Sequence, residues 1–81
     1  MNIQDRSRIE YRARVNKVMD YIDQHLDESL DLKSIAEVAS FSPFHFHRIF
    51  TFMIGESPID YIQRIRVERA AWKLREENPR S

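Results

Sequence analysis

The segment from Leu32 to Thr51, LKSIAEVASFSPFHFHRIFT, constrains the fold of this chain more than any other feature. Its first half spaces Ile35, Ala36 and Ala39 for the buried side of a short helix. Ser42-Pro43 then restarts a helix as an N-cap followed by a first-turn proline. The second half carries apolar residues at the i, i+3, i+4 and i+7 positions of a buried helical stripe, which are Phe46, Ile49, Phe50 and Met53. Two short helices joined by a tight corner predict a helix-turn-helix, a motif that usually lays its second helix in the DNA major groove.

Composition limits the chain to one small, helix-rich domain. The 81 residues include one glycine, three prolines and no cysteine, which excludes disulfides and thiolate metal sites. No apolar run approaches membrane-spanning length and the N-terminus is too polar for a signal peptide, so we expect no membrane contact and a cytoplasmic location.

The charge pattern is compatible with two interpretations. The formal net charge is zero, whereas nucleic-acid-binding domains usually show a basic excess. Acidic residues gather between Asp20 and Glu37, however, and basic residues flank that segment on both sides. One interpretation is a bipolar molecule with a single basic surface. The other is a surface on which charges of both signs are interspersed and solvated.

The whole pattern predicts an all-α fold of four helices, in which a homeodomain-like three-helix subdomain precedes a long linker helix. Residues 1–11 are polar, and we expect them to form a flexible segment. The helix-turn-helix subdomain is expected over residues 12–56, with its first helix running from about Arg12 to Leu26. Gly55 is placed to end the helix of residues 43–54 in a left-handed conformation. The linker helix is expected over residues 57–77, where Asn78-Pro79 stops it.

The expected linker helix carries apolar residues on two opposite faces. One face holds Pro58, Tyr61, Ile62, Ile65 and Trp72, and the other holds Val67, Ala70, Ala71 and Leu74. A terminal helix of a small domain needs only one apolar face. The second face is therefore expected to contact a missing part of the protein, another chain or a second copy of this one. The alternative is that its members are scattered surface apolar residues.

Three residues of the second helix of the motif are candidates for reading DNA bases. Phe44, His47 and Arg48 share one side of this helix, away from its core stripe. Arg48 can bind guanine O6 and N7 through both arms of its guanidinium, and Phe44 can pack on a thymine methyl group. His47 can donate to a base edge or to a phosphate. For Phe44, the alternative is a satellite core contact with the first helix.

Phosphate contacts are predicted for Ser42 and Thr51 on this helix and for Arg64 on the linker helix. Two other arginines of the linker helix are expected to be structural. Arg66 is placed for an ion pair between the two faces, and Arg69 is placed to pack its stem and pair its head with a carboxylate. A solvated or structural role is the alternative for Arg64 as well.

The sequence gives no sign of a metal site or of catalysis. His45 and His47 are two residues apart on a helix and point about 200° from each other at 100° per residue, so they cannot share one ion. There is no nucleophile motif, no phosphate-binding loop and no evident pair of catalytic carboxylates. We therefore predict a protein that is not an enzyme and binds no metal or other cofactor.

The segments FSPFHFHRIF, GESPIDYI and RIRVERA, preceded by the helix VNKVMDYIDQHLDESLDL, resemble the DNA-binding domain of AraC/XylS-family transcriptional regulators. The resemblance implies the first of two helix-turn-helix subdomains that enter successive major grooves, together with the linker helix. Residues 78–81 are then a tail leading to an absent second subdomain. The resemblance also implies base contacts from Phe44, His47 and Arg48. The turn glycine often found in the family is replaced by Ser40, which must accept any unusual backbone angle at some cost.

These features predict a sequence-specific bacterial transcription regulator that binds double-stranded DNA, represented by part of its DNA-binding domain. The position of Met1 leads us to expect that domain at the N-terminus of the parent protein. The alternative is a helical protein–protein interaction module that uses the helix-turn-helix as a scaffold and the outer face of the linker helix as its working surface. A DNA reader should expose Phe44, His47 and Arg48 on a positively charged ridge, whereas an interaction module should cover that ridge or surround it with acidic residues.

Overall fold

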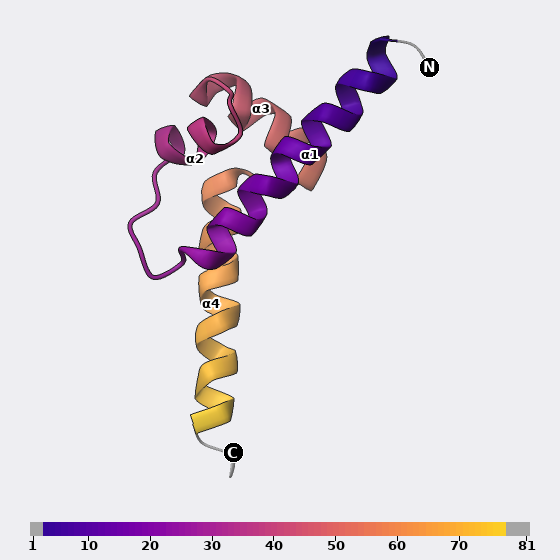
Figure 1. Cartoon of the computed structure of the whole chain (residues 1–81). Helices are drawn as coiled ribbons and strands as arrows, with labels where there is room; N and C mark the ends of the chain where they lie inside the picture. Colours follow the sequence, from indigo (N-terminus) through magenta and orange to yellow (C-terminus); the bar gives the residue numbers. More distant parts are fainter. Residues whose placement is uncertain (1–2, 78–81) are drawn as a thin grey trace.

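The computed structural model describes the backbone of residues 3–77 and the side chains of residues 8–77. Four helices follow one another along the chain: α1 (Ile3–Gln24), α2 (Leu32–Val38), α3 (Pro43–Ile54) and α4 (Pro58–Glu77). The first three pack around a common core, and much of α4 extends away from them (Figure 1). The predicted all-α fold of four helices is confirmed for the described part of the chain.

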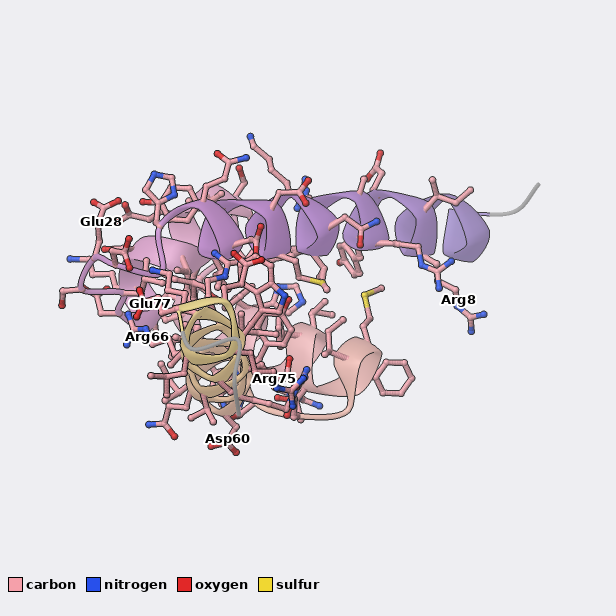
Figure 2. All side chains as sticks on the ribbon, turned by 90° about the horizontal axis from the view of Figure 1, so that it is seen from below. Arg8, Glu28, Asp60, Arg66, Arg75 and Glu77 are labelled. Atoms are coloured by element: carbon pink, nitrogen blue, oxygen red, sulfur yellow. The ribbon has the colours of Figure 1, made fainter. Side chains whose placement is uncertain are left out.

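α1 begins earlier than the sequence pattern predicted. Residues 3–11, which were expected to be flexible, continue the helix, and Arg8 lies near its projecting end (Figure 2). No glycine or proline interrupts the sequence of α1, and extending an existing helix costs far less free energy than nucleating a new one. The first two residues of the expected segment and the predicted tail of residues 78–81 lie outside the described residues.

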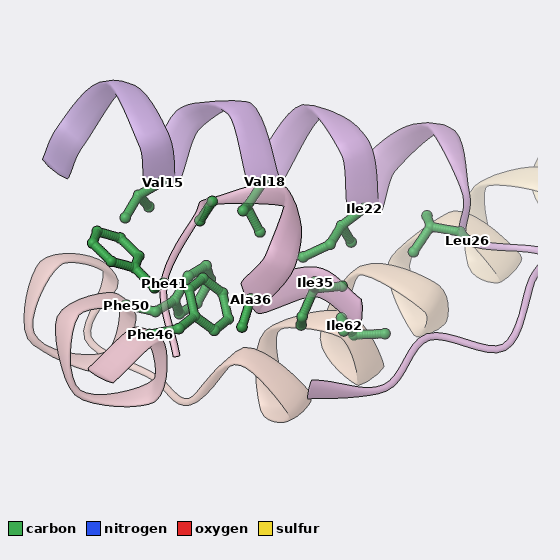
Figure 3. Packing of buried hydrophobic residues seen from close by; sticks show 11 residues of the cluster. Val15, Val18, Ile22, Leu26, Ile35, Ala36, Phe41, Phe46, Phe50 and Ile62 are labelled. Atoms are coloured by element: carbon green, nitrogen blue, oxygen red, sulfur yellow. The ribbon is translucent and has the colours of Figure 1, made fainter. Parts of the chain in front are cut away.

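The core is a single apolar cluster between the three bundled helices and the start of α4 (Figure 3). Phe46 and Phe50 are fully buried as predicted, whereas Ile49 and Met53 are half-buried at the edge of the cluster. Ala36 has no exposed surface, so a larger side chain there would have to displace its neighbours. The buried members are Val15, Val18, Ile22, Leu26, Ile35, Ala36, Ala39, Phe41, Phe46, Phe50 and Ile62.

The corner between α2 and α3 is a Schellman motif. The N–H of Phe41 donates to the carbonyl of Ala36 at 3.0 Å, and the N–H of Ser40 donates to the carbonyl of Glu37 at 3.0 Å. This geometry holds Ser40 in the left-handed region with a φ of 60°, which confirms the unusual backbone angle expected there. The motif also brings Phe41 into the core, where its side chain is 9% exposed.

Both ends of α3 carry the signals predicted from the sequence. The Ser42 hydroxyl oxygen accepts from the N–H of His45 at 3.3 Å, and Pro43 occupies the first turn. At the other end Gly55 adopts a φ of 92°, and its N–H donates to the carbonyl of Thr51 at 2.9 Å. These two signals fix where the motif's second helix starts and stops, and so which of its side chains face outward.

α4 packs on the bundle through its first two turns only. Pro58 and Ile62 are buried, and Tyr61 and Ile65 are half-buried against the core. Trp72 was predicted on this same face but is 58% exposed, because the bundle ends before it along the helix axis. The opposite face is exposed throughout, as shown by Val67, Ala70, Ala71 and Leu74.

Candidate nucleic-acid interface

Phe44, His47 and Arg48 lie together on the outer side of α3, and we call them the α3 ridge. All three are exposed, and the Phe44 side chain is 74% exposed. Because Phe46 and Phe50 turn the opposite side of the helix into the core, the ridge faces away from the rest of the molecule. The satellite core contact considered for Phe44 is therefore not formed.

The guanidinium of Arg48 lies over the ring of Phe44. Its Cζ atom is 5.9 Å from the ring centroid, within the range of a cation–π contact. The i, i+4 spacing brings the two side chains together. This contact was not predicted from the sequence, although the i, i+4 spacing of Phe44 and Arg48 is the signal that indicates it. Among the side chains of residues 8–77, no carboxylate forms an ion pair with Arg48, so its positive charge faces solvent.

The two predicted phosphate contacts on α3 differ in accessibility. Ser42 is exposed, and although its oxygen caps the helix, its hydroxyl proton is still available for donation to a phosphate. Thr51 is half-buried, and its Oγ1 atom is buried without a hydrogen-bond partner. The fold covers the Thr51 hydroxyl, because this position borders the core stripe, so the structure does not support the predicted phosphate contact of Thr51.

Arg64, the third predicted phosphate contact, is held by two carboxylates. Its Nε donates to Glu56 at 2.9 Å, its second terminal nitrogen pairs with Glu56 at 2.7 Å, and the other pairs with Glu68 at 2.9 Å. Hydrogen bonds first to Glu56 and then to Glu68 raise the pKa of Arg64 above its usual value. A phosphate would have to displace these partners, so the geometry favours the structural alternative for this residue.

His45 anchors the first turn of α3 instead of joining the α3 ridge. Its ring packs edge-on against Tyr11 at 5.9 Å and against Phe41 at 5.0 Å, measured between ring centroids. The Cζ atom of Arg14 lies 5.0 Å from the ring centroid of Phe41 and completes the cluster. His45 remains exposed, and these contacts were not predicted because Tyr11 was assigned to the flexible segment.

Two arginines of α4 bind the last turn of α1 and the loop that follows it. Arg66 donates to the carbonyl of Leu26 at 3.2 Å and to that of Glu28 at 2.7 Å. Arg69 donates to the carbonyl of Asp23 at 3.0 Å and also to the Asp23 carboxylate, which confirms its predicted ion pair. The partners of Arg66 differ from the expected carboxylate. The last carbonyls of a helix lack intrahelical partners and can accept from a side chain. Because they belong to the backbone, no residue type in the sequence indicates them.

Other kinds of site find little support in the described residues. Residues 3–77 contain no helix that is both long and apolar enough to cross a membrane. Among the side chains of residues 8–77, no three from His, Asp or Glu gather closely enough to hold a metal ion. A groove of about 610 Å³ lies between α1 and the end of α3, and its described lining contains no carboxylate, hydroxyl or imidazole.

The fold and its exposed side chains define the class of helix-turn-helix proteins. α2, the Schellman corner and α3 form a helix-turn-helix, and the second helix presents an exposed aromatic residue, an imidazole and a guanidinium. These are groups that contact base edges and backbone in protein–DNA interfaces.

Comparison with known proteins identifies the family within that class. The model of the AraC family of bacterial regulatory helix-turn-helix proteins matches residues 22–63, just over half of the chain, and the chain belongs to this family. The resemblance inferred from the sequence is confirmed.

Individual relatives agree with this assignment. The chain is 43% identical over 64 residues to the HTH-type transcriptional regulator YbfP of Bacillus subtilis, a match that covers 79% of this chain and 22% of YbfP. It is 39% identical over 56 residues to the bifunctional transcriptional activator/DNA repair enzyme AdaA of the same organism, covering 69% of this chain and 26% of AdaA. It is 30% identical over 64 residues to the multiple antibiotic resistance protein MarA of Escherichia coli, covering 79% of this chain and 50% of MarA. The chain thus spans half or less of each of these relatives.

Proposed function

We propose that this chain is the DNA-reading part of a bacterial transcription regulator, and that α3 enters the major groove of double-stranded DNA with the α3 ridge against the base edges. The observation that carries the proposal is the exposed ridge on the second helix of the motif, in a chain of the AraC family. Arg48 supplies a fork for guanine, Phe44 an apolar contact for a thymine methyl group, and His47 a donor to a base or phosphate. Ser42 orients the helix on a phosphate.

The protein–protein interaction module is the less supported alternative. Such a module would cover the α3 ridge or place acidic residues around it. The ridge is exposed, and α3 itself contains no aspartate or glutamate. A target on the bacterial chromosome also implies a cytoplasmic location, and nothing in this proposal requires an enzymatic activity.

We further propose that α4 links this helix-turn-helix to a second subdomain of a longer protein. Val67 and Leu74 are 69% and 65% exposed on the outer face of α4, and Ala70 and Ala71 lie between them. Relatives of which this chain spans half or less support the existence of further protein around it. Self-association through the same face is the alternative occupant of this surface.

Binding to DNA is tested first by fluorescence anisotropy of a labelled random duplex at two salt concentrations. We expect weak binding that falls steeply as salt rises, because phosphate contacts release counterions. Selection from a random library then supplies the preferred sequence. If neither random nor selected duplexes bind even at low salt, the proposed DNA-reading role of this chain fails.

The base-reading role of Arg48 is tested with Arg48→Ala on the selected and random duplexes. We expect a loss of about 1–3 kcal/mol in specific binding and little change on random DNA, since a lost base contact removes discrimination. Arg75→Ala is the matched control, because Arg75 is an exposed arginine in the last turn of α4, outside the α3 ridge. An unchanged ratio of specific to random binding in Arg48→Ala would refute this role.

A further inference from the structure

The outer half of α4 has almost no apolar attachment to the bundle. Burial along α4 ends with Ile62, half-buried packing on the core ends with Ile65, and every later described residue is exposed except half-buried Arg69. A helix held only at its first two turns can pivot about that contact. The direction of α4 therefore depends on any contact that lies farther along the helix.

We infer that Arg66 and Arg69 are positioning residues that lock the direction of α4 relative to α1, and through α1 relative to the α3 ridge. Their guanidinium groups reach carbonyls of Asp23, Leu26 and Glu28 at 2.7–3.2 Å. These contacts join residues 38–46 positions apart in sequence, where α1 ends and the loop to α2 begins. Figure 2 shows Arg66 on the side of α4 that faces the loop with Glu28.

The residue type suits this role. The guanidinium of Arg66 presents several donors in a rigid fork, so one side chain binds two carbonyls at once. The acceptors lie at and just beyond the C-terminal end of α1, where unpaired carbonyls and the negative end of the helix dipole attract a cation. The Asp23 carboxylate adds a charge-assisted bond to Arg69.

A small rotation at the start of α4 would produce a large displacement at its end. At 1.5 Å per residue, the distance from Ile62 to Glu77 is about 22 Å, and a swing of about 20° would move the end of the helix by about 8 Å. On the proposed function, this lock sets how any second DNA-binding subdomain after α4 is placed relative to the α3 ridge. Both arginines lie beyond residues 22–63, the stretch that the family model matches.

The lock is tested by double electron–electron resonance between spin labels on α1 and α4 in solution without DNA. The chain contains no cysteine, so Lys17→Cys and Glu76→Cys at two exposed positions give the only labelling sites. We expect a narrow distance distribution for this labelled chain. Adding Arg66→Met and Arg69→Met should broaden the distribution by several ångström, on the scale of the displacement estimated above, while circular dichroism shows that the helices persist.

Arg64→Met is the matched control, because Arg64 is on the same helix but pairs with Glu56 and Glu68 and lies over the ring of Tyr61, and none of these three partners belongs to α1. It should leave the distribution narrow. Should the double variant fail to fold, Arg66→Lys replaces it. Lysine keeps the charge but presents it on a flexible stem without the rigid, planar fork of donors, so the distribution should still broaden. The inference is overturned if the folded double variant, or Arg66→Lys, gives a distance distribution as narrow as that of the parent. Arginines that only stabilise the fold would change the unfolding midpoint and leave the distance distribution unchanged.

Failure of the lock and failure of the proposed function give different results. Broadening in the variants of a chain that binds no DNA supports the lock and counts against the function. Loss of DNA binding in the variants with an unchanged distance distribution overturns the lock and leaves the function standing.

Discussion

Ser40 is the one residue other than glycine, among those described, that adopts a positive φ. The Schellman motif requires it, because the bonds from Ser40 and Phe41 back to the last turn of α2 close only when the residue between the helices is left-handed. For a residue with a Cβ atom this conformation costs roughly 1–2 kcal/mol. The corner of the helix-turn-helix therefore carries strain that the surrounding packing must offset.

Ser40→Gly should stabilise the protein. Glycine relieves the strain, but it also gains conformational freedom in the unfolded chain, so we expect a net increase of about 0.5–1 kcal/mol in the free energy of unfolding. Urea unfolding followed by far-UV circular dichroism measures it. Gly55→Ser is the reciprocal variant: an added Cβ there meets no atom within 4 Å, so backbone strain alone should lower stability by about 1 kcal/mol. A destabilised Ser40→Gly would contradict the strain argument.

α2 is the element that depends most on its surroundings. Its seven residues are too few for a stable isolated helix. Burial of Ile35 and Ala36 holds it in place, and its N-terminus is capped by Asp31, whose carboxylate accepts from the N–H of Ser34 at 2.7 Å. That backbone hydrogen bond is the main reason why the pKa of Asp31 lies below its usual value of 3.8.

The cap makes part of the stability of α2 dependent on pH. Because the folded pKa of Asp31 is lower than the unfolded value, the stabilisation is complete above pH 3.8 and is lost as the pH falls through the lower folded pKa. Asp31→Asn caps without a charge. The stability difference between the parent and this variant should be constant near neutral pH and change below pH 3.8, as measured by urea unfolding across that range. A difference that stays the same down to pH 2 would show that the charge of Asp31 plays no part.

The elements were predictable where the sequence carries a local signal. Ser42-Pro43 and Gly55 mark the ends of α3, and the spacing of Phe46 and Phe50 identifies its buried side. The exposure of the α3 ridge followed from these signals, whereas contact between the ridge and DNA remains a prediction. The start of α1 was not predictable in this way, because a polar sequence without glycine or proline is compatible with both helix and flexible chain.

The contacts between elements were less predictable than the elements. The two carboxylate partners of Arg64 and the carbonyl partners of Arg66 depend on the angle at which α4 leaves the core. Helical spacing cannot supply that angle. The covered hydroxyl of Thr51 has a similar origin, because a position bordering the core stripe is exposed or covered according to how neighbouring helices pack.

At the scale of the whole molecule, the chain is elongated. Its Cα radius of gyration is 15.2 Å and its extents are 55 × 26 × 18 Å, whereas a compact domain of this length would have a radius of about 12 Å. The projecting parts are the start of α1 and the outer half of α4 (Figure 1). Such a shape leaves the end of α4 with few tertiary contacts, so we expect its local stability to be lower than that of the bundle.

The chain's single tryptophan, Trp72, lies on this outer half of α4 and is 58% exposed. Its indole emission should therefore already be red-shifted in the native protein and open to quenching by acrylamide. On heating, emission should follow the fraying of α4 and change before the cooperative loss of far-UV ellipticity, which reports the bundle. Coincident transitions would show that α4 melts together with the core. Intrinsic fluorescence in this protein thus reports on the linker helix and on whatever covers its end, and it does not report the unfolding of the core.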